Sequence, residues 1–180
     1  MKKSLLLLGG ALVLFSNSAF GWGKMGHDAI AYIAECNLTP KAKKTIEKIL
    51  GHSIVYYATW MDEWRAEPGY EHTSAWHTAS VDKNLVYAPR PKGDVIFALE
   101  DAIAKLQDYK QQDDSTVVMS LRCIIHFVGD MHCPVHVKYA DQKSYNVYLN
   151  GDKCSYHNVW DDQIISRSHR WGYLEYAHQL

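Results

Sequence analysis

Long apolar runs, basic runs and alternating strand patterns are all scarce in this sequence of 180 residues. Its one long apolar run covers about eleven residues at 5–15, whereas a membrane-spanning helix needs roughly 20, so no spanning segment is predicted. No run of Lys and Arg is present to hold a nucleic acid by charge, so a polyanionic partner would need countercharge from another source. Weak strand patterns occur only at 86–89 and 145–149, and there is no repeat or low-complexity tract.

The first 21 residues have the pattern of a secretory signal peptide. A lysine pair precedes the apolar run, and the small residues Ala19 and Gly21 occupy the −3 and −1 positions of a cleavage site. Cleavage after Gly21 makes Trp22 the mature N-terminus, and cleavage one or two residues away is the competing interpretation. No cysteine lies at the junction, so we expect no lipid anchor and a secreted or periplasmic protein.

Residues 22–180 are long enough for one domain with its own core. They carry 17 basic and 20 acidic side chains, a formal charge of −3. An even number of cysteines in an exported chain allows two disulfides in any of three pairings, and four buried thiols are the alternative. The cysteines are Cys36, Cys123, Cys133 and Cys154.

Helical signals dominate this part of the chain. Thr39 and Pro40 have the residue types of an N-cap and a first helical position, and Gly51 that of a helix stop. Asp94 starts a second predicted helix. Ser115 is predicted to cap a third, which is apolar on nearly all sides and is expected at the centre of a bundle. The other expected segments are helices at 22–36 and 157–169 and long loops at 52–93 and 137–156. The predicted fold is all-α, a single-domain multi-helix bundle with long loops.

Histidines and aspartates occur where an apolar core should not contain them. His126 and Asp130 lie four residues apart on the apolar central helix, so their side chains share one face, about one turn apart. Burying an imidazole and a carboxylate there is unfavourable unless they are paired, and a single hydrogen bond between them is the simplest explanation. His157 and Asp161, however, repeat the same spacing.

Three more such residues make a simple pair insufficient. His136 follows the central helix directly, and Asp62 and His77 both lie among tryptophans. So many imidazoles and carboxylates in apolar or aromatic surroundings predict several bound cations. Imidazole and carboxylate ligands together suit zinc, whereas the four cysteines lack the paired spacing of a cysteine zinc site.

In this order, these residues resemble the zinc-ligand set of the single-strand-specific zinc nucleases of fungi and plants. That family is related to bacterial zinc-dependent phospholipase C. The segment HFVGDMHCPVH at 126–136 closely resembles the family's central motif. The matching positions are Trp22, His27, Asp62, His77, His126, Asp130, His136, His157 and Asp161. The resemblance implies a phospholipase C/zinc nuclease-like fold and a zinc-dependent nuclease domain over 22–180.

The resemblance also implies three Zn²⁺ ions. In the family the mature N-terminal tryptophan binds zinc through its α-amino nitrogen and carbonyl oxygen, so signal cleavage would complete the site. One aspartate bridges two of the ions. The implied ligand sets are Trp22, His27 and Asp130 for the first ion; Asp130, Asp62, His77 and His126 for the second; and His136, His157 and Asp161 for the third.

The implied activity is hydrolysis of phosphodiesters in single-stranded DNA or RNA, and of 3′-nucleotides, leaving 5′-phosphate ends. The zinc pair lowers the pKa of a water that attacks phosphorus, and the third zinc stabilises the leaving oxygen. The residues expected to take part in catalysis are Asp62, Arg65 and Asp130, with Arg65 as a planar phosphate donor or, alternatively, a surface arginine. The expected partner is a single-stranded nucleic acid or nucleotide, and the expected state is a monomer.

The sequence departs from the family pattern in two places. Thr78 and Ser80 replace an aromatic residue and a carboxylate that contact the base in the family's nucleases. Other aromatic residues are candidates for stacking on a base or, equally, for the core: Tyr145, Tyr148, Tyr156 and Trp160. The chain also ends soon after Asp161, whereas family members usually continue for several helices, so it is either a natural short form or a C-terminally truncated fragment. Two alternatives stay open, a zinc-dependent phospholipase C and a non-catalytic zinc-binding remnant. Asp161 favours the nuclease, because the lipases often carry Glu there.

Overall fold

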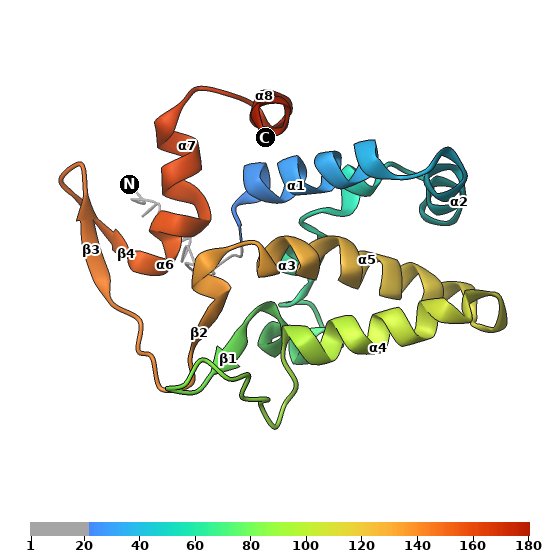
Figure 1. The fold of residues 1–180 in the computed structure, drawn as a ribbon, viewed down its shortest axis with the longest axis horizontal. Coiled ribbons are helices and arrows are strands. Elements are labelled where there is room, and N and C mark those ends of the chain that lie inside the picture. The colour runs from blue at the N-terminus through green and yellow to red at the C-terminus, as the bar shows by residue number, and fades with distance from the viewer. Residues whose placement is uncertain (1–21) are drawn as a thin grey trace, which may run out of the picture.

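The computed structural model describes residues 22–180, and this part of the chain is mostly helical (Figure 1). The signal peptide predicted for residues 1–21 lies outside the described residues. The α-helices are α1 (Lys24–Asn37), α2 (Pro40–Leu50), α3 (Trp60–Trp64), α4 (Val95–Gln107), α5 (Asp114–Met131), α6 (Tyr156–Asn158), α7 (Ile164–Ser168) and α8 (Tyr173–Gln179). The prediction of an all-α fold is confirmed. None of the helices described for residues 22–180 is both long and apolar enough to cross a membrane.

The capping residues predicted for three helices are confirmed for two of them, α2 and α4. The Thr39 hydroxyl accepts a hydrogen bond from the Ala42 amide at the start of α2, and Gly51 ends that helix with φ +80°. Asp94 caps α4 as predicted. The prediction for α5 is wrong, because Asp113, not Ser115, accepts the hydrogen bond from the Thr116 amide. The helix therefore begins two residues earlier than predicted, at Asp114.

Helix α5 forms the centre of the helical body, as predicted. It packs against α4 on one side and α1 on the other, and α2 and α3 also contact it (Figure 1). Its buried stripe continues through Cys123 and Phe127 to the polar residues His126 and Asp130. Phe127 and Met61 are fully buried in the adjoining hydrophobic core. The stripe that anchors the helix therefore also places the polar pair inside the protein.

The long loop expected at 52–93 is instead a series of short elements. It contains 3-10 turns at Ile54–Tyr57 and Glu71–His77, helix α3 between them, and strand β1 (Ala79–Val81). Strand β1 pairs in parallel with β2 (Val137–Tyr139). The expected strand at 86–89 does not form, since Tyr87 makes only an isolated bridge to Val81.

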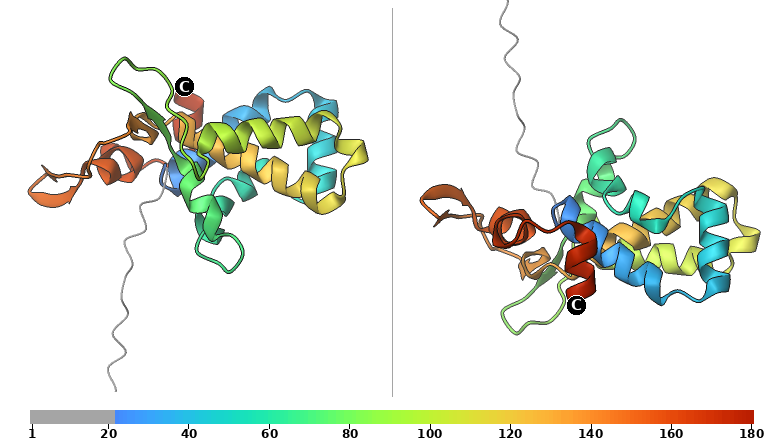
Figure 2. Two further views of the ribbon diagram at one scale, coloured as in Figure 1. Left: turned by 90° about the horizontal axis from the view of Figure 1, so that it is seen from below. Right: turned by 90° about the horizontal axis from the view of Figure 1, so that it is seen from above.

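The segment expected as a second long loop, 137–156, ends in a hairpin. Strands β3 (Asn146–Leu149) and β4 (Asp152–Ser155) pair antiparallel, and β3 matches the weak strand pattern at 145–149. The turn residues Asn150 and Gly151 have φ +53° and +91°, as a tight hairpin turn requires. This hairpin projects away from the helical body (Figure 2).

The predicted helix at 157–169 is confirmed as a helical path made of α6, a π-helical turn at Val159–Gln163, and α7. The amide of Gly23, just before α1, donates to the Asp161 carbonyl oxygen over 2.5 Å. This bond brings the start of the described chain beside the π turn. Helix α8, which was not expected, packs against α1.

Candidate metal centre

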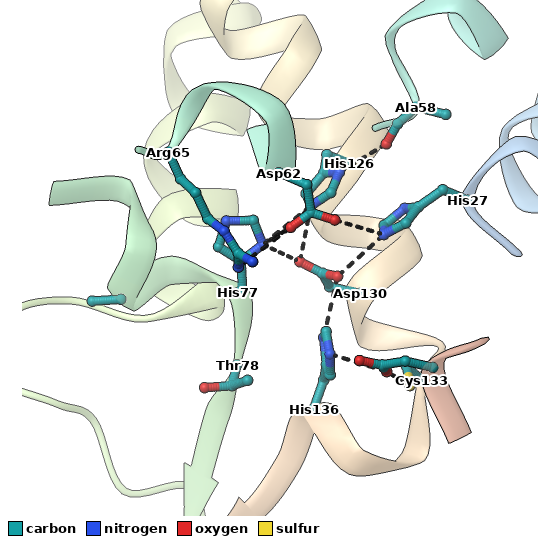
Figure 3. Close-up of polar contacts among 12 residues, drawn as sticks. His27, Ala58, Asp62, Arg65, His77, Thr78, His126, Asp130, Cys133 and His136 are labelled. Carbon is teal, nitrogen blue, oxygen red and sulfur yellow. Dashed lines mark hydrogen bonds and ion pairs between the residues drawn. The ribbon is translucent and has the colours of Figure 1, made fainter. Parts of the chain in front are cut away.

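Six of the expected metal ligands converge in the interior of the protein (Figure 3). They are contributed by α1, α3, the 3-10 turn at Glu71–His77, α5 and the 3-10 turn at Pro134–His136. All are almost completely buried. The converging residues are His27, Asp62, His77, His126, Asp130 and His136.

Asp130 lies at the centre of this cluster, and its carboxylate contacts four imidazoles. The Nδ1 atoms of His77 and His136 lie 2.9 and 3.1 Å from its oxygens. The Nε2 atoms of His126 and His27 lie 3.3 and 3.4 Å away. The residue expected to bridge two cations therefore has imidazoles around both of its oxygens.

The ring of His126 is held with one nitrogen toward this centre. Its Nδ1–H donates to the Ala58 carbonyl oxygen over 2.7 Å, which leaves Nε2 facing Asp130. Such a carbonyl contact is the usual way of orienting a metal-binding histidine. Nε2 also lies 3.1 Å from Nδ1 of His77, so two ring nitrogens point at one region of space.

Two groups of candidate ligands share His126. The structure brings together Asp62, His77 and His126, three of the four ligands expected for the second ion, with their ligand atoms within 4.8 Å of one another. His27, His126 and Asp130 form another such group. His126 thus belongs to both groups, whereas sequence reasoning placed it in one.

A third group surrounds Asp161 on the π turn. His157 Nε2 lies 2.7 Å from Asp161 Oδ2, and His136 Nε2 lies 3.5 Å from Oδ1. The rings of His136 and His157 stack with centroids 5.0 Å apart. The structure adds a member that the sequence analysis missed, since the sulfur of Cys133 lies 2.9 Å from Asp161 Oδ1.

Buried atoms without hydrogen bonds test whether these groups fit a cation. Both ring nitrogens of His27 and of His136 are buried without a hydrogen-bond partner, as are one oxygen of Asp62 and one of Asp130. Each such atom costs roughly 1–3 kcal/mol if it stays unpaired. His136 Nδ1 approaches Asp130 Oδ1 to 3.1 Å, yet the two atoms do not form a hydrogen bond. Lone pairs that converge without bonding one another fit a bound cation, and the donor set suits zinc.

Burial and carboxylate contacts shift the pKa values of the cluster's histidines in opposite directions. Burial lowers the pKa of His27 and of His77 to about 4, so both rings are neutral at pH 7, the form that binds metal. Burial also acts to lower the pKa of His136, but contacts with Asp130 and Asp161 outweigh it and raise the value to about 9. The two carboxylates therefore keep the His136 ring protonated, and its positive charge offsets part of their negative charge. A divalent cation would supply the same charge.

A cavity of about 350 Å³ borders the ligand groups. His77, His136 and His157 form part of its wall. Tyr145 and Tyr156, also in the wall, stack with ring centroids 4.8 Å apart. The basic side chains that line the cavity are Arg65, Arg90, Lys138 and Lys143. A cavity with this lining suits an anionic ligand that carries a flat ring.

The two positions that depart from the resemblance lie at different depths. Thr78 lines the cavity, and its carbonyl oxygen accepts a hydrogen bond from Arg90. Ser80 lies buried in β1 and is not part of the cavity wall. Arg65 lies between the cavity and the ligand cluster, with Nη1 3.3 Å from Asp62 Oδ1.

Comparison with known proteins places this geometry in a family. Residues 22–179 match the family model described as S1/P1 Nuclease. The chain belongs to the S1/P1 nuclease family.

Three relatives illustrate the similarity. Nuclease S1 of Aspergillus oryzae is 24% identical over 89% of this chain and 60% of its own length. Endonuclease 2 of Arabidopsis thaliana is 28% identical over 81% of this chain and 56% of its own. Nuclease P1 of Penicillium citrinum is 28% identical over 78% of this chain and 57% of its own. This S1/P1 family chain thus spans less than two thirds of the length of these relatives.

In this S1/P1 family chain, Trp22 packs against the first turn of α1. Its indole packs on Gly26, where an added Cβ would lie 2.8 Å from Trp22 Cε3. The next residue, Gly23, donates its amide to the Asp161 carbonyl. Trp22 as a ligand through a free amine remains a prediction.

Gly129 allows α1 and α5 of this family member to approach closely at the cluster. An added Cβ would lie 2.7 Å from Nδ1 of His27, whose ring is fully buried and has no space to retreat. We therefore expect Gly129→Ala to displace His27, destabilising the fold by roughly 1–3 kcal/mol and weakening metal binding. Thermal unfolding and zinc titration measure both effects. Val128→Ala, at the exposed neighbouring position, is the control, and equal zinc affinity in the two variants would contradict the packing argument.

Proposed function

We propose that this chain is an exported, monomeric, zinc-dependent phosphodiesterase of single-stranded DNA or RNA and of 3′-nucleotides, leaving 5′-phosphate ends. The observation that supports it most is the position of Asp130, surrounded by four imidazoles next to a basic cavity. Relatives named nuclease and endonuclease support the same chemistry. The domain assigned to this activity is 22–180, and the signal peptide is 1–21.

The three ligand groups would each hold one zinc ion, with the memberships proposed from the resemblance. When bound, zinc polarises phosphoryl oxygens and provides a water that is acidic enough to react near neutral pH. Asp62 and Asp130 contribute by holding the imidazoles in place. Trp22 would complete the group of His27 through its free amine.

The other residues of the cavity would orient the substrate. Arg65 is oriented by Asp62 and can donate to a phosphate oxygen with a planar guanidinium. Lys138 and Lys143 would attract the nucleic acid backbone. The stacked pair of Tyr145 and Tyr156 would offer a flat surface to any base, in place of the aromatic residue missing at position 78.

Metal content provides the first test of the proposal. We expect three zinc ions per chain in protein that begins at Trp22 and is purified without chelator, because the ligands form three groups. Elemental analysis with an independent protein concentration measures this ratio. A reproducible value of one or none after zinc reconstitution would exclude the trinuclear site.

A substrate panel tests the activity itself. The zinc-loaded protein is expected to cleave single-stranded DNA, RNA and a 3′-nucleotide and to leave phosphatidylcholine intact, and chelation should abolish the cleavage. Turnover of phosphatidylcholine alone would instead assign a phospholipase C. A fully loaded protein that is inactive on all four substrates would indicate a non-catalytic zinc-binding protein.

A further inference from the structure

All four cysteines lie within the described residues. Among them, only Cys133 has its sulfur in contact with a candidate metal ligand. All four are free thiols; Cys123 and Cys133 are buried, whereas Cys36 is exposed. Of the two alternatives, two disulfides or four buried thiols, the structure has no disulfide among them, and only two of the thiols are buried. Cys133 follows α5, is 1% exposed, and has its sulfur 2.9 Å from Asp161 Oδ1.

Asp161 presents its two oxygens to different partners. Oδ2 faces His157 Nε2 at 2.7 Å, whereas Oδ1 faces the Cys133 sulfur at 2.9 Å and His136 Nε2 at 3.5 Å. The ligand atoms of Cys133, His136 and Asp161 all lie within 4.8 Å of one another. Sulfur, nitrogen and oxygen therefore surround one position on the Oδ1 side.

His136 provides independent evidence for a ligand at this position. Its side chain is 1% exposed, and neither ring nitrogen makes a hydrogen bond. Nε2 and Asp161 Oδ1 lie 3.5 Å apart without a hydrogen bond, a separation that a shared cation would account for. The Cys133 sulfur approaches the same oxygen of Asp161 as His136 Nε2 does.

We propose that the Cys133 thiolate is a direct ligand of the cation bound by His136 and Asp161. This rests on the proposed function, which places a zinc ion in that group, and it adds a soft donor to an otherwise nitrogen and oxygen set. Thiolates bind zinc at about 2.3 Å and favour soft cations over hard ones. This site should therefore retain zinc or accept cadmium more readily than the two sites around Asp130.

Binding requires the sulfur to lose its proton to solvent as the cation enters, with no change in oxidation state. In the structure the Cys133 thiol donates to Asp161 Oδ1, and the cation would take the place of that proton. The alternative role is a hydrogen bond alone, in which the thiol donates to Asp161 and never contacts the metal. The two roles differ in whether sulfur and metal share a bond.

Cobalt substitution distinguishes these roles without any activity measurement. The purified protein is loaded with Co²⁺, its metal content is measured, and the near-ultraviolet charge-transfer absorption of a thiolate–cobalt bond is recorded. We expect this absorption in the wild type and its loss in Cys133→Ser, which keeps a hydroxyl donor for Asp161. It should persist in Cys123→Ala, a matched control in which a buried thiol is removed from the core. Circular dichroism checks the fold of each variant.

X-ray absorption at the zinc edge of the wild-type protein needs no variant. We expect a sulfur neighbour at about 2.3 Å in addition to nitrogen and oxygen neighbours at about 2.0–2.1 Å. A protein with full metal content but no sulfur neighbour and no charge-transfer band would overturn the role of Cys133 and leave the proposed metal sites intact. Persistence of the band in Cys133→Ser would also overturn it. Failure to bind any metal would overturn both this proposal and the proposed function.

Discussion

The Asp130→Asn variant is expected to lose zinc and activity together, with a rate about a hundredfold lower, a rise of about 2.7 kcal/mol in the barrier. Asp130 is fully buried, and its oxygens lie within 3.4 Å of four imidazole nitrogens. An amide of the same size keeps the shape but removes the negative charge. The cations of two groups would then be held less tightly and repel each other more strongly.

Two variants calibrate this effect. Asp101→Asn removes an exposed carboxylate from α4 that pairs only with Lys105, and it should leave zinc content and rate unchanged. Arg65→Gln should lower the rate less than Asp130→Asn does and keep all of the zinc, because Arg65 contacts Asp62 without being a ligand. Normal turnover with full zinc in Asp130→Asn would show that Asp130 does not bridge two cations.

One extra glycine ahead of Trp22 is expected to remove one zinc ion and to lower the rate about tenfold, equivalent to about 1.4 kcal/mol in the barrier. A free α-amine with a pKa of roughly 7.7–8 can bind zinc near neutral pH, whereas an amide nitrogen is a very poor ligand. The indole of Trp22 packs on Gly26, and the amide of Gly23 is bonded to Asp161. The chain end therefore has little freedom to shift and compensate.

The experiment uses a cleavable tag that leaves either Trp22 or Gly-Trp22, and mass spectrometry confirms each end. Helical content should be the same in both proteins, because the helices depend on their apolar faces and not on the chain end. The difference should therefore appear in zinc content and rate alone. Equal values in the two proteins would show that the tryptophan at the cleavage point has no role in the site.

Local signals in the sequence were sufficient where one or two side chains decide the structure. Thr39, Gly51 and Asp94 act on amides within a few residues, so their effects can be derived without knowing the fold. The start of α5 was misplaced because Asp113 and Ser115 are both residue types that cap helices, and only the structure shows that Asp113 accepts from the Thr116 amide while the Ser115 hydroxyl donates to Asp113. The short elements within 52–93 carry almost no periodic signal, since each is only three to seven residues long.

The ligand cluster could be anticipated only in part. The spacing of His126 and Asp130 on one helix fixes their shared face, and the structure places both in the cluster. Which residues from other segments join them depends on tertiary packing, and the family resemblance supplied that information. Cys133 was missed because it replaces no expected ligand and lacks a second cysteine nearby. Its role depends on the distance to Asp161, which no local pattern encodes.

The contacts within the cluster join residues far apart along the chain. His126 is 49 residues from His77 and 68 from Ala58, and His77 is 53 residues from Asp130. An unfolded chain cannot hold these groups together, so under the proposed function a cation binds the native state almost exclusively. Mass action then stabilises the fold by about 2.7 kcal/mol when free zinc is a hundredfold above its dissociation constant. Under that proposal the lifetime of the protein would follow the zinc supply of its surroundings, and scarcity of the metal would lead to unfolding as well as to inactivity.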